Sequence, residues 1–381
     1  MIVSAVTLTG ARQRGSMNLP LAAPLPSPPA PTAESESAPE DQLEQALFEV
    51  KRVVVGQDGM VERLLVCAIA GGHCLLEGPP GLAKTLAAKT LAVVLGGSFA
   101  RVQFTPDLVP ADVVGTRIYR PSREAFDIET GPVFANVVLA DEINRASPKV
   151  QSALLEVMAE HQVSIGGISH PVPSPFLVLA TQNPIESEGV YPLPEAQRDR
   201  FLMKVLVDYP TDREEAEIVR RVGVTMPSAN PVLSPDLWRR MQQRAADVFV
   251  HDGVVDYCVR IVAATRRPAA HGLGELEPFI AYGVSPRATL GLVAAARSLA
   301  LMRRRRYVLP RDVFDVAPDV LRHRLVMSYE AMASEITAEH IVKHVMSTVW
   351  APQITPGQNA PAASISAQSN LEAQPVVAVA S

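Results

Sequence analysis

Short apolar runs alternate with helical stretches over the first half of the chain. The runs that predict strands are His73–Glu77, Ala100–Gln103, Asn136–Ala140, Pro175–Thr181 and Lys204–Val207. Strands that are apolar along their whole length are typical of a parallel sheet covered by helices on both faces. Beyond Pro210 the pattern predicts helices only, over Asp212–Arg221, Pro235–Ala246, Asp252–Arg266, Pro286–Arg303 and Pro310–Arg322. We therefore predict an α/β domain followed by an all-helical domain, with a boundary near Tyr209.

Two further segments do not fit a simple alternation of strand and helix. Between Asp112 and Phe134 two strand-like stretches flank a turn, and between Gln162 and Pro173 two more flank Gly166-Gly167. Both segments predict β-hairpins inserted into the α/β domain. Exposed hairpins on a domain of this kind are expected to face partners.

The two ends of the chain differ in composition from its middle. The 381 residues are 48% hydrophobic, which is enough for a large core and two domains. At both ends the chain is rich in Pro, Ala and Ser, and such segments cannot bury enough surface to offset their ordering entropy. We predict a disordered leader over residues 1–40, the α/β domain over 41–209, the helical domain over 210–350 and a disordered tail over 351–381. Met1 and Met17 are both candidates for the first residue of the protein.

Charge and cysteine usage exclude several classes of protein. The net charge of −5 argues against a broad basic face, so no nucleic-acid partner is expected, and Arg303–Arg306 is interpreted mainly as a solvated helix end. Cys67, Cys74 and Cys258 lie in apolar stretches without metal-ligand spacing, which is typical of core residues in a reducing compartment. No segment has the length of a membrane span, and the N-terminus lacks a secretory pattern. We expect a cytoplasmic protein.

One loop predicts a nucleotide site. Gly78 to Thr85 read Gly-Pro-Pro-Gly-Leu-Ala-Lys-Thr, between an apolar run and a helix start. Such a loop turns backbone N–H groups toward phosphates, with Lys84 reaching the same oxygens and Thr85 ligating Mg²⁺. Ala83 stands where a second glycine usually precedes the lysine, and it costs about 1–3 kcal/mol unless its φ is negative. A nucleoside triphosphate is the expected ligand.

Two carboxylates end the apolar run that begins at Val137. At such a strand tip Asp141 can hold Mg²⁺ through a water, and Glu142 can orient and deprotonate the water that attacks the γ-phosphate. The alternative is an acidic helix N-terminus capped at Asp141. About sixty residues after a phosphate loop, the hydrolytic interpretation is favoured.

Polar residues follow the next strand and precede the last one. Asn183 can hydrogen-bond the γ-phosphate or the attacking water without adding charge, and Gln182 and Thr181 are the second choices for this role. An Asn before Pro184 is also an ordinary turn residue. Arg200 can reach the γ-phosphate of an adjacent subunit, with Arg198 as the alternative. Arg287, just inside a predicted helix, can fold onto the nucleotide and couple the two domains.

Together these motifs resemble the MoxR family of AAA+ ATPases. The resemblance covers about residues 41–350 and rests on Val55–Gln57, Gly78–Thr85, Leu139–Ala146, Thr181–Pro184, Tyr191–Gln197, Asp199–Phe201, Ser285–Ala288 and Val320–Arg324. An alanine at Ala83 is usual in this family. Arg198 departs from the family pattern, which more often has an apolar residue there, so either Arg198 or Arg200 remains open as the arginine that acts in trans.

The resemblance implies ATP and Mg²⁺ bound between an α/β core and a helical lid, in a ring that is expected to be a hexamer. It places Gly78, Pro79, Pro80, Gly81, Leu82, Ala83, Lys84, Thr85 and Leu86 around the phosphates. It places the stretch Val54–Gln57 beside the adenine, with Val54, Gly56 and Gln57 as the binding residues. It implies roles for Lys84 at the phosphates, Thr85 and Asp141 at Mg²⁺, Glu142 as base, Asn183 as first sensor, Arg200 as arginine finger and Arg287 as second sensor.

The resemblance also implies a function. Members of the family are thought to remodel or mature client enzyme complexes with partners that carry a von Willebrand factor A domain. Two alternatives stay open: the motor subunit of a metal chelatase, and a nucleotide-gated scaffold with little turnover.

Overall fold

The structure is a computed structural model that describes residues 39–184, 189–222 and 227–353. The predicted disordered leader and tail lie almost wholly outside these residues. Helix α1 (Pro39–Val53) includes the last two residues of the predicted leader. In the described part of the chain, no helix combines the length and apolar character needed to cross a bilayer.

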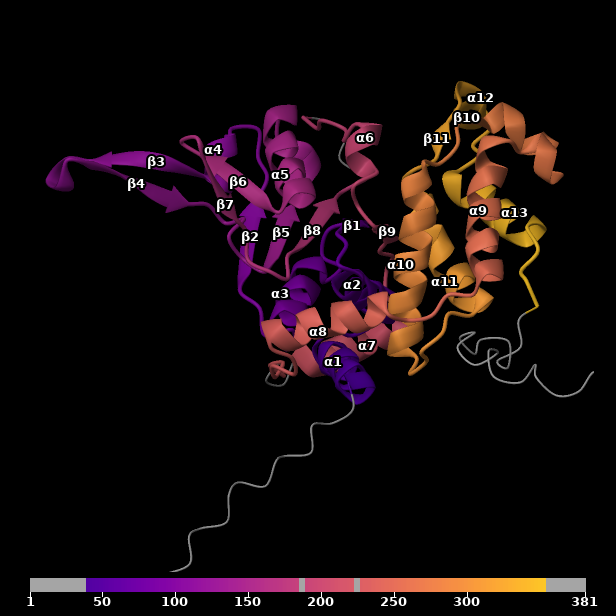
Figure 1. Cartoon of the computed structure of the whole chain (residues 1–381), viewed down its shortest axis with the longest axis horizontal. Helices are drawn as coiled ribbons and strands as arrows, with labels where there is room; N and C mark the ends of the chain where they lie inside the picture. The colour runs from indigo at the N-terminus through magenta and orange to yellow at the C-terminus, as the bar shows by residue number, and fades with distance from the viewer. Residues whose placement is uncertain (1–38, 185–188, 223–226, 354–381) are drawn as a thin grey trace, which may run out of the picture. The chain divides into compact units, whose positions relative to one another are not determined.

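A five-stranded parallel sheet forms the centre of the α/β part (Figure 1). Its strands are β1 (Cys74–Glu77), β2 (Phe99–Gln103), β5 (Val137–Asp141), β8 (Leu177–Gln182) and β9 (Met203–Leu206), in the order β2-β5-β8-β1-β9. All five predicted strands are confirmed within a few residues. The order places β8 between β1 and β5, so the ends of these three strands meet at one edge of the sheet.

Side chains of the central strands alternate between two apolar cores, one on each face of the sheet. In β1, Leu76 belongs to the first core and Leu75 to the second. Helices α2 (Asp58–Ala70) and α3 (Lys84–Val94) pack on the first face, with α1 against both of them, and α5 (Pro148–Glu160) packs on the second. Burial on both faces explains the continuous apolar runs of the sequence.

Both predicted hairpins are present. The first is β3 (Gly115–Arg120) with β4 (Ala125–Thr130), preceded by α4 (Pro110–Val114), and it projects away from the sheet (Figure 1). The second is β6 (Gln162–Ile165) with β7 (Ile168–Pro171). The projecting hairpin exposes two aromatic rings: Tyr119 and Phe126 pair across its strands, with ring centroids 5.2 Å apart.

The second half of the chain is mainly helical, as predicted. It consists of α7 (Asp212–Val222), α8 (Pro235–Ala246), α9 (Asp252–Arg266), α10 (Pro286–Met302), α11 (Pro310–Leu321), α12 (Tyr329–Ala333) and α13 (Ala338–Thr348). The expectation of helices alone was incomplete, because β10 (Ile280–Tyr282) and β11 (Val326–Met327) form a small antiparallel sheet. These strands are too short to leave a periodic pattern in the sequence. Short helical segments complete the chain: α6 (Glu195–Arg198) and the 3-10 turns η1 (Pro121–Arg123), η2 (Ile143–Arg145), η3 (Ala269–His271) and η4 (Gly274–Phe279).

The proposed domain boundary near Tyr209 stays a prediction. Helices from beyond it contact the α/β part: α8 and α10 both pack against α2. The indole Nε1 of Trp238 in α8 donates to the carbonyl oxygen of Ala68 at 2.9 Å.

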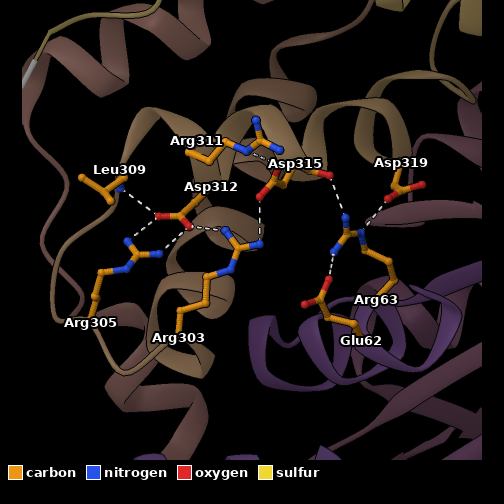
Figure 2. Close-up of polar contacts among 9 residues, drawn as sticks. All are labelled: Glu62, Arg63, Arg303, Arg305, Leu309, Arg311, Asp312, Asp315 and Asp319. Atoms are coloured by element: carbon orange, nitrogen blue, oxygen red, sulfur yellow. Dashed lines mark hydrogen bonds and ion pairs between the residues drawn. The ribbon is translucent and has the colours of Figure 1, made fainter. Parts of the chain in front are cut away.

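The basic run Arg303–Arg306 lies at the end of α10, and Arg303, Arg304 and Arg306 are exposed, as expected of a solvated helix end. Two of its guanidinium groups also contact a buried carboxylate, which was not expected. Arg303 Nη1 and Arg305 Nη2 lie 2.9 and 2.6 Å from Oδ1 of Asp312, whose side chain is fully buried. Figure 2 shows both guanidinium groups converging on this carboxylate. Arg304 pairs with Asp41 on α1 at 2.7 Å. Arg303 and Arg305 supply the opposite charge that the buried carboxylate of Asp312 requires. The three cysteines are buried and free, as expected.

Candidate active site

The carboxyl ends of β1, β5 and β8 open onto a cavity of about 390 Å³. In parallel α/β sheets this edge is where ligands bind. The residues that line the cavity come from three loops that follow these strands, and they include Lys84, Thr85, Asp141, Glu142 and Asn183. Five side chains predicted separately from the sequence are therefore brought together.

The loop after β1 has no room for larger residues at its start. A Cβ atom at Gly78 would lie 2.3 Å from the carbonyl oxygen of Val207, and Gly81 has a φ of +84°. The backbone N–H of Gly78 donates to the carbonyl of Gln182 at 3.3 Å, which joins the loop to the end of β8. Close packing and a left-handed turn thus account for both glycines.

Lys84 extends back over this loop. Its Nζ donates to the carbonyl oxygen of Gly78 at 2.6 Å. Burial lowers the pKa of Lys84, while the nearby carboxylates of Asp141, Glu142 and Glu77 oppose that change. No side chain caps the N-terminus of α3, where Lys84 begins the helix. A cation and uncapped backbone N–H groups at one helix N-terminus suit a phosphate.

Ala83 adopts a positive φ of 57° with ψ of 17°. The condition under which an alanine would be tolerated here, a negative φ, is therefore not met. The left-handed region costs an L-residue about 1–2 kcal/mol. The strain lies at the residue that turns the loop into α3, so the phosphate loop stores it.

We expect Ala83→Gly to make the chain without nucleotide about 0.5–1 kcal/mol more stable, because relief of the left-handed strain exceeds the entropy that glycine loses on folding. Urea unfolding measures the effect. The control is Ala263→Gly, inside α9, which should destabilise the chain by a similar amount. A loss of stability in both variants would show that the loop is not strained.

Two oxygen-bearing side chains of the cavity, Thr85 and Asp141, lie close together. Thr85 Oγ1 lies 3.5 Å from Asp141 Oδ2. Thr181 Oγ1 donates to Asp141 Oδ1 at 2.6 Å and fixes the carboxylate. Among the described residues no group of three or more His, Cys, Asp or Glu could form a metal cage. A hydroxyl and one carboxylate fit Mg²⁺, which takes few protein ligands and otherwise binds water and substrate phosphates.

Glu142 is held by residues of three elements, β2, η2 and β8. Its carboxylate Oε2 accepts from Gln103 Nε2 at 2.8 Å and pairs with Arg145 Nε at 3.0 Å. Its φ of 57° is another left-handed backbone, secured where its N–H donates to Thr181 Oγ1 at 2.8 Å. The side chain of Glu142 is therefore fixed at the cavity rather than free in solvent.

Two residues at this site were missed from the sequence. Arg101 Nη2 lies 2.7 Å from Asp141 Oδ2, and Gln103 contacts Glu142. Both lie on β2, which pairs with β5 so that Gln103 is opposite Asp141. Only the strand order brings them to the site, and the sequence carried no signal of that order.

A second pocket of about 320 Å³ adjoins the phosphate loop. Gln57 lines it and donates from Nε2 to the carbonyl oxygen of Asp208 at 3.0 Å. Of the stretch Val54–Gln57 that was expected beside the adenine, Val55 also lines the pocket, whereas Val54 is buried in the core. Gly56, with a φ of +73°, makes the turn between Val55 and Gln57. The opposite wall comes from residues that the sequence analysis did not identify: Tyr209, Pro210, Glu215 and Ile218.

The three arginines predicted to act at the nucleotide lie outside both pockets. Of the described residues that line either pocket, none is Arg198, Arg200 or Arg287. Arg200 is exposed and donates from Nη1 to the carbonyl oxygen of Leu155 at 2.7 Å, whereas Arg198 is half-buried. Arg287 is 61% exposed and lies 3.6 Å from Asp199 Oδ2. Exposure favours Arg200 over Arg198 for a role at another subunit.

Comparisons with known proteins agree with this geometry. The model of the "ATPase family associated with various cellular activities (AAA)" matches residues 73–203, and that of the "AAA lid domain" matches residues 276–345. The fold and the site thus define an AAA ATPase with a core and a helical lid.

Similar proteins narrow the class. Chaperone MoxR1 of Mycobacterium tuberculosis is 60% identical over 333 residues, 87% of this chain and 88% of that protein. Protein MoxR of Methylorubrum extorquens is 32% identical over 80% of this chain and 93% of its own. A crystal structure from Cytophaga hutchinsonii, of a protein provisionally assigned as an ATPase, has a TM-score of 0.78 and 44% identity over 83% of this chain and 96% of its own. The chain belongs to the MoxR family of AAA+ ATPases.

Proposed function

We propose that the chain hydrolyses ATP with Mg²⁺ in a ring, which we expect to be a hexamer in the cytoplasm, and uses the energy to remodel or mature a client protein complex. The observation that carries the hydrolytic part is the convergence of Lys84, Thr85, Asp141, Glu142 and Asn183 on one cavity. Chaperone activity is suggested by the name of the mycobacterial relative, Chaperone MoxR1.

Each side chain has a role that its position supports. Lys84 and the start of α3 bind the phosphates, and the second pocket takes the adenine beside Gln57. Thr85 and Asp141 hold Mg²⁺, which supplies charge neutralisation at the transferred phosphoryl group. Glu142, aimed by Gln103, orients the attacking water and accepts its proton. Asn183, at the end of β8, hydrogen-bonds the γ-phosphate or that water.

Completion of the site requires a second subunit. Arg200 is exposed on the segment between α6 and β9, where it can reach the γ-phosphate bound by a neighbour. Arg287, exposed at the first turn of α10, senses nucleotide within its own subunit.

We propose the projecting hairpin β3–β4 as the surface that contacts the client protein. Tyr119 and Phe126 are 49% and 55% exposed, and Arg117 lies over the Phe126 ring at 4.2 Å. Exposed aromatic residues on a rigid two-stranded element suit contact with another protein. A partner with a von Willebrand factor A domain is proposed from the family alone.

Capture of a client tests the remodelling function. Immobilised Glu142→Gln chain loaded with ATP and Mg²⁺ should retain a client that is released in ADP, because ring closure persists when hydrolysis is blocked. Lys84→Ala is the control that cannot hold ATP. Recovery of the same proteins in ADP, or on Lys84→Ala, would contradict nucleotide-dependent client binding.

A further inference from the structure

The motif Val320–Arg324 has no role in the proposed hydrolysis, yet it ends in a buried charge. The side chain of Arg324 is 4% exposed. It follows α11 and reaches into the α/β part, where Nη2 donates to the carbonyl oxygen of Phe201 at 2.7 Å and Nη1 to that of Leu202 at 3.0 Å. A lid residue thus satisfies backbone carbonyls of the segment that leads into β9.

Asp199 is the counter-ion of Arg324. Its Oδ1 accepts from Arg324 Nε at 2.8 Å, and the side chain is 17% exposed. Two residues at the start of α10 share the same carboxylate: Ser285 Oγ donates to Oδ2 at 3.0 Å, and Arg287 Nη1 lies 3.6 Å from Oδ2. Three lid residues therefore converge on one side chain of the α/β part.

The contacts differ in strength. Arg324 is enclosed and makes charge-assisted hydrogen bonds, and removing one partner of such a buried pair leaves an uncompensated charge. Arg287 is mostly exposed and its contact with Asp199 is longer than a hydrogen bond, so it can exchange Asp199 for a phosphate. Of the two arginines that contact Asp199, Arg324 is therefore the enclosed partner and Arg287 the exchangeable one.

Arg200 is the next residue after Asp199. From the geometry we propose that Arg324 fastens the segment Asp199–Leu202, which contains Arg200, to the lid through Asp199 and the carbonyls of Phe201 and Leu202. Arg324 is a positioning residue for the arginine finger: lid movement on nucleotide exchange in one subunit repositions the finger at its neighbour's site. This inference rests on the proposed action of Arg200 in trans.

Two conservative variants test the fastening. Arg324→Lys keeps the charge and loses the forked donor geometry, whereas Asp199→Asn keeps the shape and loses the charge. Because displacement of a catalytic group by about 1 Å costs about 100-fold, we expect each homogeneous ring to lose about 10- to 100-fold in ATP turnover while binding ATP normally.

A matched control separates this role from general loosening of the lid. Arg63 on α2 also carries an ion pair to the lid, from Nε to Asp319 Oδ2 at 2.7 Å, and Figure 2 shows this contact. Its partners Glu62, Asp315 and Asp319 lie outside the Asp199–Leu202 segment. Arg63→Lys should therefore leave turnover close to that of the unaltered chain. An equal loss in Arg63→Lys would overturn the assignment.

Rings that mix two kinds of subunit test whether Arg324→Lys and Asp199→Asn lose turnover because the arginine finger Arg200 is displaced. Glu142→Gln subunits cannot hydrolyse ATP but present an intact finger, so adding them should restore turnover at the sites of Arg324→Lys or Asp199→Asn subunits. Arg200→Ala subunits, mixed in the same way, test the action in trans by itself. Rescue of Arg200→Ala without rescue of the other two variants would overturn the positioning role of Arg324 but leave the action of Arg200 in trans standing. Absence of rescue for Arg200→Ala would overturn the proposed action in trans, and the inference with it. Unchanged turnover in both homogeneous variants would also overturn the inference.

Discussion

Glu142→Gln is expected to lower the rate of ATP turnover by about 100- to 10,000-fold, the usual contribution of a general base, while nucleotide affinity changes little. Glutamine has the same shape, and its amide oxygen can still accept from Gln103 Nε2, which lies 2.8 Å from the carboxylate in the unaltered chain. What the variant loses is the ability to take a proton from water. The backbone at this position, with its positive φ, is not altered by the change.

Phosphate release under saturating ATP and Mg²⁺ measures the rate, and a fluorescent ATP analogue measures affinity. The control is Glu160→Gln, an exposed glutamate at the end of α5, which should not change either quantity. Turnover equal to that of the unaltered chain would remove Glu142 as the base. Its placement among cavity residues would then require a purely structural explanation.

Lys84→Ala is expected to abolish useful nucleotide binding. Truncating one partner of a buried charge interaction costs about 2–5 kcal/mol, which corresponds to about 30- to 5,000-fold in affinity. Lys84 is half-buried, and burial lowers the pKa of its ammonium while Asp141, Glu142 and Glu77 favour the charged form. Without a nucleotide its Nζ donates to the carbonyl oxygen of Gly78 at 2.6 Å. With one bound, the cation is available to the phosphates beside the N-terminus of α3.

Titration with ATP and with ADP measures the change, and Lys89→Ala provides the control. Lys89 lies on the same helix α3 but is exposed, so its removal should leave affinity nearly unchanged. If Lys84→Ala bound ATP as tightly as the control, the loop after β1 would not be the phosphate site.

The two variants also separate the proposed function from the nucleotide-gated scaffold. A nucleotide-gated scaffold would lose its nucleotide-dependent activity in Lys84→Ala but keep it in Glu142→Gln, because nucleotide binding without hydrolysis would be sufficient. A remodelling ATPase loses client binding in Lys84→Ala and client release in Glu142→Gln. The capture experiment and the turnover measurements therefore distinguish these alternatives together.

The sequence by itself determined the elements and the chemistry of the phosphate loop. Apolar runs of strand length exist because a parallel strand is buried on both faces, as Leu75 and Leu76 of β1 show. That requirement is local, so the sequence could predict the five strands. The residue types at Lys84, Thr85, Asp141 and Glu142 follow from the chemistry of phosphate and Mg²⁺ in the same way. Their convergence on one cavity is shown by the structure, where the carboxyl ends of β1, β5 and β8 meet at one edge of the sheet.

The tertiary structure alone decided the contacts between elements that lie far apart in the chain. It placed Gln103 on Glu142 through the pairing of β2 with β5, and Val55 rather than Val54 in the second pocket. It also joined Arg324 to Asp199 across the lid, and gave Ala83 the positive φ that its residue type disfavours. Each depends on strand order, on the packing of one element against another, or on a turn whose strain is offset elsewhere. None of these leaves a periodic or local pattern, because their energy comes from partners that the sequence does not place side by side.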